Sequence, residues 1–170
     1  GDPLPEFDLI GFTLQYELSY TNILNMLDLA GIPIRAKDRT ELTPIIVGGG
    51  PCACNPEPIS DFFDLFMLGD GEEVTNELID LLISCKKAKT TKYEFLKKAA
   101  QIKGVYVPSL YEIEYNDDKT IKTVNAIDGA PEKVTKRIIS DLDSVHYPEK
   151  FIVPFVEVVH DRVVHEILRG

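Results

Sequence analysis

Three loops could hold a ligand, because each follows an apolar run typical of a buried strand, and ligands of such sheets bind where these loops meet helix N-termini. They span residues 13–19, 48–55 and 69–73. Glycine at 48, 49 and 50 removes every Cβ from the second loop, which therefore either admits a ligand or another backbone at close range or makes a tight turn with positive φ. Both interpretations stay open. The third loop is also glycine-rich, but its acids at 70, 72 and 73 make it a poor cradle for phosphate.

Residue spacing does not support the other common site chemistries. The sequence has no Gly-x-Gly-x-x-Gly fingerprint, no Walker loop and no Gly-x-Ser-x-Gly nucleophile elbow. Cys52, Cys54 and Cys85 are too few for a disulfide framework and lack the spacing of a zinc site, so we interpret them as free thiols. His160 and His165 would point to opposite faces of a regular strand, which favours a solvated or packed role over catalysis.

Three apolar runs are the elements that must position the loops. Residues 8–14, 44–47 and 64–68 have the near-continuous apolar pattern of strands buried on both faces of a parallel sheet. Each run is followed by a predicted helix. Such repeated strand–helix units predict an α/β fold with a doubly wound parallel sheet, Rossmann-like or flavodoxin-like, and right-handed crossovers.

The expected helices have recognisable ends. The first lies between an N-cap at Ser19 and a left-handed C-cap at Gly31, and the second starts at Asn55-Pro56 and reaches about Phe63. The third carries acids at 72 and 73 in its first turn and lysines at 86 and 87 in its last turn, which complements the helix dipole. Thr91 and Glu94 form a capping box for a fourth helix.

The pattern changes after residue 90 from alternating strands and helices to β-rich segments. Residues 105–115 and 120–127 alternate around a polar turn, which predicts a β-hairpin, and residues 134–139 and 156–168 are further β-branched segments. We therefore expect two parts. Residues 1–103 form the α/β domain and residues 104–170 form a β-rich appendage that contains the hairpin.

Composition and charge restrict the partners of the chain. Hydrophobic residues make up 44% and charged residues 27%, as in an ordinary globular protein, and no apolar run approaches the roughly 20 residues of a spanning helix. We expect a cytoplasmic protein without a membrane partner. The net charge is −10, and residues 1–85 hold 15 acids against Arg35, Lys37 and Arg39, a net of −12. Such an acidic half disfavours nucleic-acid binding.

Three motifs together resemble a known family. Asp-Leu-Ile-Gly-Phe-Thr at 8–13, Gly-Gly-Pro at 49–51 and Asp-Leu-Phe-Met-Leu-Gly-Asp-Gly-Glu-Glu at 64–73 are similar to the N-terminal cobalamin (B12)-binding-type domain of radical S-adenosylmethionine (SAM) proteins. The resemblance covers roughly residues 6–86; Asp70 stands where the family usually has Glu. Residues 104–150 resemble the connecting region of an uncharacterised iron–sulfur oxidoreductase subfamily, and residues 158–170 resemble the first barrel strand of a radical SAM domain.

This resemblance implies cofactors and a partner. It implies an accessory domain that binds cobalamin and presents it to the cluster domain; no catalytic residue and no metal ligand is expected in this chain. The implied cofactor-binding residues are Thr13, Gln15, Gly48, Gly49, Gly50, Pro51, Gly69, Asp70, Gly71 and Glu72. A [4Fe-4S] cluster and S-adenosylmethionine are expected only beyond Gly170, where the cysteine motif would begin. The partner would be the C-terminal radical SAM domain of the parent chain. A first strand–helix unit with the axial histidine would lie upstream of residue 1.

Two alternatives stay open. The domain could be degenerate, keeping the fold but serving as a scaffold or docking module without cofactor; the acidic first half and the absence of an axial histidine motif favour this, whereas the glycine loops do not. A flavodoxin-like response or nucleotide module would need a phosphate-binding first loop. Residues 15–19, Gln-Tyr-Glu-Leu-Ser, are poorly suited to that role.

Overall fold

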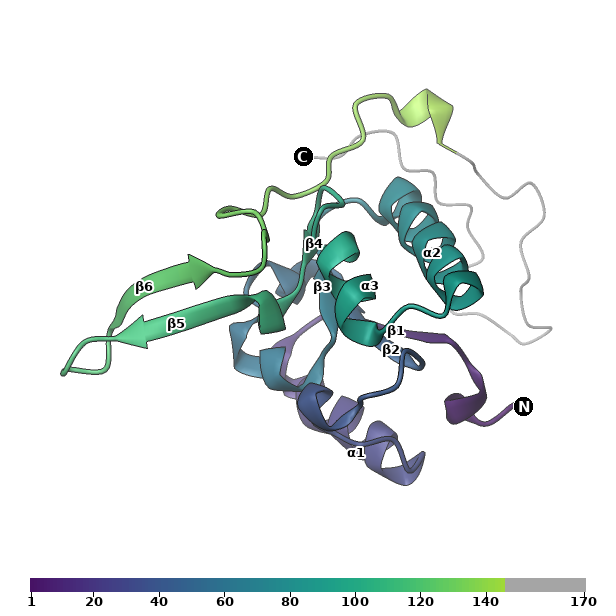
Figure 1. Ribbon diagram of the computed structural model, residues 1–170, viewed down its shortest axis with the longest axis horizontal. Helices are drawn as coiled ribbons and strands as arrows, with labels where there is room; N and C mark the ends of the chain where they lie inside the picture. The colour runs from purple at the N-terminus through teal and green to yellow at the C-terminus, as the bar shows by residue number, and fades with distance from the viewer. Residues whose placement is uncertain (146–170) are drawn as a thin grey trace, which may run out of the picture.

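A four-stranded sheet forms the centre of the computed structural model, which describes residues 1–145 (Figure 1). Its strands lie side by side in chain order: β1 (Leu9–Thr13), β2 (Ile45–Gly49), β3 (Leu65–Met67) and β4 (Val105–Tyr106). β1, β2 and β3 are parallel, and β4 pairs antiparallel with β3. The three predicted parallel strands are confirmed, so their carboxyl ends share one edge of the sheet.

Strand β2 is buried on both faces because its side chains alternate between two cores. Ile45 and Val47 belong to the core that α2 (Gly71–Ala88) and α3 (Lys92–Ala99) cover, whereas Ile46 belongs to the core under α1 (Tyr20–Leu29). Full burial of each such side chain contributes about 1.5–3 kcal/mol. The two cores hold helices against both faces of the sheet (Figure 1).

The architecture is α/β, with a mostly parallel four-stranded sheet and a separate two-stranded antiparallel sheet. Helices cover both faces of this sheet. The doubly wound strand order expected from the sequence stays a prediction. A ligand crevice of the doubly wound kind forms where the order of the strands reverses. Within residues 1–145, however, β1 to β4 follow one another without a reversal.

The helix predicted from Asn55 to about Phe63 is wrong in type. Residues in this crossover form two 3-10 helices, Pro51–Cys54 and Glu57–Phe62, and the second has Pro56 as its N-cap. Pro58 within it supplies no N–H, and 3-10 hydrogen bonding suits such short, proline-rich pieces. Ile59 of the second helix still packs in the core under α1.

The other helices begin and end close to the predicted positions. α1 follows Ser19 and ends before Gly31, whose φ is 68°, and the acids and lysines expected at the two ends of α2 lie there. Thr91 and Glu94 form the predicted capping box at the start of α3. In the part of the chain that the structure describes, no helix is both long and apolar enough to cross a membrane.

The predicted hairpin is present, but the strand expected over residues 105–115 is divided. Its first two residues form β4 in the central sheet, a 3-10 turn follows at Pro108–Leu110, and β5 (Tyr111–Tyr115) pairs antiparallel with β6 (Ile121–Ala126). Pro108 has no N–H to continue the ladder, which accounts for the break. The hairpin projects away from the body of the domain (Figure 1).

Residues 134–139 differ from the expected β-branched segment. They form one parallel bridge, between Arg137 and Gly69, rather than a strand. The segment at 156–168, its two histidines and the loop around Tyr147-Pro148 lie outside the described residues. The segment around Arg137 therefore returns to the central sheet at the end of β3, next to one of the predicted site loops.

Candidate functional site

The carboxyl edge of the parallel strands brings the predicted site loops together, and we call it the glycine rim. Thr13 at the end of β1 pairs in register with Gly49 at the end of β2, and Gly69 follows β3. Thr13, Gln15 and Pro51 are exposed. The predicted residues thus share one edge.

Gly48 lies within β2 rather than in the turn, and it accommodates an aromatic ring. A Cβ on Gly48 would lie 2.6 Å from Cδ1 of Phe66 and 3.2 Å from Cδ1 of Phe63. The rings of Phe63 and Phe66 pack with centroids 4.9 Å apart. Gly48 is therefore needed for packing of the core, because a side chain there would displace two buried phenylalanines.

Gly50 makes the turn at the rim and meets the chain's own backbone. Its φ is 93°, and a Cβ would lie 3.0 Å from Cγ2 of Thr13 and 3.2 Å from the backbone N and O of Leu14. Cys52 N–H donates to the Leu14 carbonyl at 3.0 Å. The sequence left two interpretations of this loop, a tight turn with positive φ or close approach of another backbone or a ligand. Gly50 shows both features, because its φ is positive and the backbone of Leu14 lies against it. Gly49 differs, because a Cβ there would make only an ordinary contact, 3.8 Å from the Met67 carbonyl.

The loop after β3 holds a segment from the far end of the described chain. The Arg137 N–H donates to the Leu68 carbonyl at 2.7 Å, and the Asp70 N–H donates to the Arg137 carbonyl at 3.0 Å. A Cβ on Gly69, whose φ is 96°, would lie 2.1 Å from the Arg137 carbonyl oxygen. Only glycine at position 69 permits this approach, so the space beside Gly69 is filled by the protein's own backbone.

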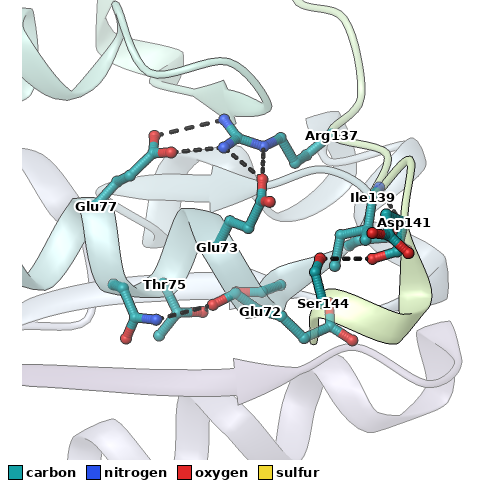
Figure 2. A network of polar contacts seen from close by, with 11 residues as sticks. Glu72, Glu73, Thr75, Glu77, Arg137, Ile139, Asp141 and Ser144 are labelled. Carbon is teal, nitrogen blue, oxygen red and sulfur yellow. Dashed lines mark hydrogen bonds and ion pairs between the residues drawn. The ribbon is translucent and has the colours of Figure 1, made fainter. Parts of the chain in front are cut away.

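Side chains strengthen the same contact, and Figure 2 shows the Arg137 guanidinium bonded to Glu73 and Glu77. Asp70 is the N-cap of α2, but its carboxylate accepts from the Ile139 N–H at 2.8 Å instead of capping the helix. The Arg137 guanidinium binds Glu73 at 2.7 Å and Glu77 at 2.5 Å, one turn apart on α2. Hydrogen bonds to Glu73 and then Glu77 raise the pKa of Arg137, so the guanidinium stays charged.

We call this arrangement the linker clasp: residues 137–139 bound to the 68–70 loop and to two glutamates of α2. Gly71 begins α2, and Glu72 is half-buried in its first turn. A cavity of about 390 Å³ lies beside the clasp and is lined by Gly69, Asp70 and residues 136–143. Two of the acids that made this loop unsuitable for phosphate, Asp70 and Glu73, have a backbone amide and an arginine as their partners.

Metal and thiol chemistry have little basis at the rim. Within residues 1–145 no group of three or more histidine, cysteine, aspartate or glutamate side chains is arranged to hold a metal ion. Cys52 is half-buried, Cys54 is exposed and Cys85 is buried, all as free thiols. Burial, and then Glu17, raises the pKa of Cys52, which keeps that thiol protonated rather than nucleophilic.

Sequence reasoning missed Arg137, which lies 68 positions from Gly69 and carries no motif of its own. A signal was nevertheless present. Glu73 and Glu77 are four residues apart on one helical face, with no base three or four residues away on α2 to pair with them, so a cation from elsewhere is expected. Which cation it is depends on the fold.

Comparisons with known proteins agree with the rim motifs. The family described as radical SAM proteins, N-terminal, matches residues 1–108. An uncharacterized protein of Methanocaldococcus jannaschii is 37% identical over 84 residues; the match covers 46% of this chain but only 17% of that protein. No solved structure matches the chain.

Proposed function

Because the chain belongs to the family of N-terminal domains of radical SAM proteins, we propose that it is an accessory domain that holds the linker to the following radical SAM domain and so sets the position of that domain. The observation that carries the proposal is the linker clasp. The backbone of Arg137 makes two hydrogen bonds with the 68–70 loop, and the Ile139 N–H donates to the Asp70 carboxylate. The Arg137 side chain adds two ion pairs with α2.

The charge of the domain supports a docking role over a phosphate-binding one. Residues 1–85 carry a net charge of −12, and the clasp uses two of their carboxylates to hold a guanidinium. The partner in this proposal is the C-terminal radical SAM domain of the parent chain. The [4Fe-4S] cluster and S-adenosylmethionine would be bound there, and turnover would belong to that domain.

The test uses the parent protein with one spin label on α1 and one on the following domain. Gly69→Ala removes the space for the Arg137 carbonyl, whereas Gly129→Ala changes a positive-φ glycine with open space around it. Pulsed electron paramagnetic resonance then measures the distance between the domains. We expect a broad distance distribution for Gly69→Ala and an unchanged one for Gly129→Ala. Identical distributions in both variants would refute the proposal.

Cobalamin binding is the second candidate, and one observation favours it: Thr13 and Gly49 are paired at the rim, with Thr13 exposed and the Gly49 position open. The fit is incomplete elsewhere in the described residues. Gly50 is closed by Leu14, and Gly69 is closed by Arg137. A nucleotide tail would have to displace residues 137–139 before it could lie against Gly69.

A titration with hydroxocobalamin separates the two candidates. If the rim binds the cofactor only after the clasp opens, Gly69→Ala will bind it more tightly than the natural sequence, and Thr13→Ala will weaken that binding. Heat of binding and the visible spectrum are the readouts. Unchanged heat and absorbance for all three proteins would rule out cobalamin on this part of the chain and leave the docking role intact.

A further inference from the structure

A second cavity lies at the opposite edge of the sheet, away from the glycine rim. Its volume is about 540 Å³, within the range of small-molecule sites. Its walls come from residues 35–40, the 3-10 helix at Glu57–Phe62, the start of α3 and residues 106–113. Asp64, which precedes β3, also lines it. No glycine of the rim contributes to it, so it is a separate place in the molecule.

Basic residues are concentrated at this cavity. Arg35, Lys37 and Arg39 are the only bases among residues 1–85, and all three line it together with Lys92. The lining acids are Glu57, Asp61 and Asp64, so four cations face three carboxylates. In a stretch with a net charge of −12, this excess of positive charge is local and indicates an anionic ligand.

The floor of the cavity is a buried cluster in which one carboxylate serves two cations. Asp64 is 2.8 Å from Lys92 Nζ and 3.2 Å from Arg39 Nη2, and all three side chains are at most 8% exposed. The Ile46 N–H also donates to Asp64 at 2.7 Å. The cluster keeps one positive charge in excess. Burial lowers the pKa of Lys92, and the nearby Arg39 adds to this effect, whereas Asp64 opposes it.

The two cations differ in their freedom to bind a ligand. The Arg39 guanidinium uses its donors on Asp64 and on the carbonyls of Pro33, Ile34 and Phe62. The Lys92 ammonium has three donors, and its acceptors among residues 1–145 are Asp64 and the Arg39 carbonyl. One donor of Lys92 is thus available at the cavity. Lys37 is exposed and makes no ion pair with any described residue.

Aromatic and apolar side chains form the rest of the wall. The Tyr106 and Tyr111 rings pack with centroids 5.1 Å apart, and Tyr106 stacks at 6.3 Å on Phe66, which carries the wall into the core. Tyr93 and Leu96 line the cavity from α3. A flat, apolar body fits such a wall better than a hydrated inorganic ion does.

We propose that this cavity binds an organic anion in which a carboxylate or phosphate monoester is attached to an aromatic body. The acidic group would lie near Lys92 and Lys37, and the ring would lie against the tyrosines. The site is independent of the linker clasp, because no residue of the clasp lines the cavity.

The test titrates the 170-residue chain with phenyl phosphate and benzoate while amide signals are followed by NMR. Inorganic phosphate and benzyl alcohol represent the two halves of the ligand. We expect at least one aromatic anion to shift the signals of residues 35–40, 92–93 and 106–113 saturably, and to bind at least tenfold more tightly than either half. Absence of saturable shifts, or equal affinity for phosphate or benzyl alcohol, would overturn the proposal.

A matched pair of variants tests the charge. Lys37→Glu and Lys103→Glu reverse the charge of two exposed lysines, of which only Lys37 lines the cavity. We expect at least a tenfold loss of affinity in Lys37→Glu, an unchanged affinity in Lys103→Glu, and similar melting temperatures for the two variants. Equal affinities in both variants would overturn the assignment.

Discussion

The two edges of the central sheet hold chain segments in opposite ways. At the glycine rim, the linker clasp joins residues 137–139 to the domain through backbone hydrogen bonds and through ion pairs with half-exposed glutamates. At the other edge, Asp64, Arg39 and Lys92 are buried together and tie the 33–39 loop, the crossover before β3 and the start of α3 into one unit.

Because the ion pairs are exposed at one edge and buried at the other, the two contacts differ in how easily they can open while the domain stays folded. Exposed ion pairs contribute about 0–1 kcal/mol each, whereas removal of one partner from a buried pair costs about 3–5 kcal/mol. The ion pairs of the clasp can therefore open at modest cost, whereas opening of the buried cluster would strongly destabilise the domain.

The largest expected effect is at the buried cluster. Asp64→Asn leaves Arg39 and Lys92 buried with no carboxylate, and we expect it to lower the free energy of unfolding by about 3–5 kcal/mol in urea denaturation. Asp61→Asn is the control, because it removes the exposed Arg35–Asp61 pair of the same edge and should cost less than about 1 kcal/mol. A similar small loss in both variants would show that the buried cluster contributes no more to stability than an exposed ion pair of the same edge.

The next effect is at the glycine rim. Gly69→Ala combines an unfavourable positive φ with a clash against the Arg137 carbonyl, and we expect a loss of about 2–3 kcal/mol. Amide hydrogen exchange should also become faster at Arg137, Ile139 and Asp70. Gly129→Ala shares the positive φ without a neighbour within 4 Å, so it should cost about 1 kcal/mol and leave this exchange unchanged. Slow exchange in Gly69→Ala would contradict a glycine-dependent clasp.

A smaller effect is expected from the clasp's side chain. Arg137→Gln removes the ion pairs with Glu73 and Glu77 and should cost about 1 kcal/mol, decreasing with salt because both glutamates are exposed. Thermal unfolding at low and high ionic strength measures this difference. Lys136→Gln, at an exposed neighbour without an ion pair in the described residues, should show neither effect. Equal losses at both salt concentrations would argue against an electrostatic clasp.

The smallest expected effect is the pH dependence of the capping box that places Lys92 at the start of α3. The backbone N–H of Thr91, and then its hydroxyl, lower the pKa of Glu94 below its ordinary value of 4.5. A lowered folded-state pKa means that this stabilisation is fully present above 4.5 and is lost as the pH falls through the folded value. The stability difference between the natural sequence and Glu94→Gln should shrink over that acid range. A constant difference would contradict the capping role.

Local features of the fold follow from neighbouring residues and are readable in the sequence. The alternation of Ile45, Ile46 and Val47 predicts a strand buried on both faces, and Thr91 with Glu94 predicts the start of α3. Two local expectations failed next to prolines: residues 57–62 form a 3-10 helix instead of an α-helix, and Pro108, which has no N–H for the ladder, divides an expected strand. The β-rich segment expected at 134–139 contains no proline and forms only the bridge at Arg137.

The candidate site divides in the same way. That the glycine loops meet at one edge could be predicted from residue types, because parallel strands bring their carboxyl ends together. The atoms that each glycine meets could not be predicted: they belong to Phe66 at Gly48, Leu14 at Gly50 and Arg137 at Gly69. A positive φ or a missing Cβ can be inferred from residue type, but the atom that fills the space comes from a distant part of the chain.

The opposite edge shows the same limit. The sequence displays three bases within five positions of an acidic stretch. It does not display that Asp64 and Lys92, 25 and 53 positions from Arg39, contact Arg39 in a buried cluster. Burial of a charge requires a partner of opposite sign, but the partner can come from any strand or helix that the packing brings within about 3 Å. The partners of Arg39 are therefore determined by the packing of the whole domain and cannot be predicted from its neighbours in the sequence.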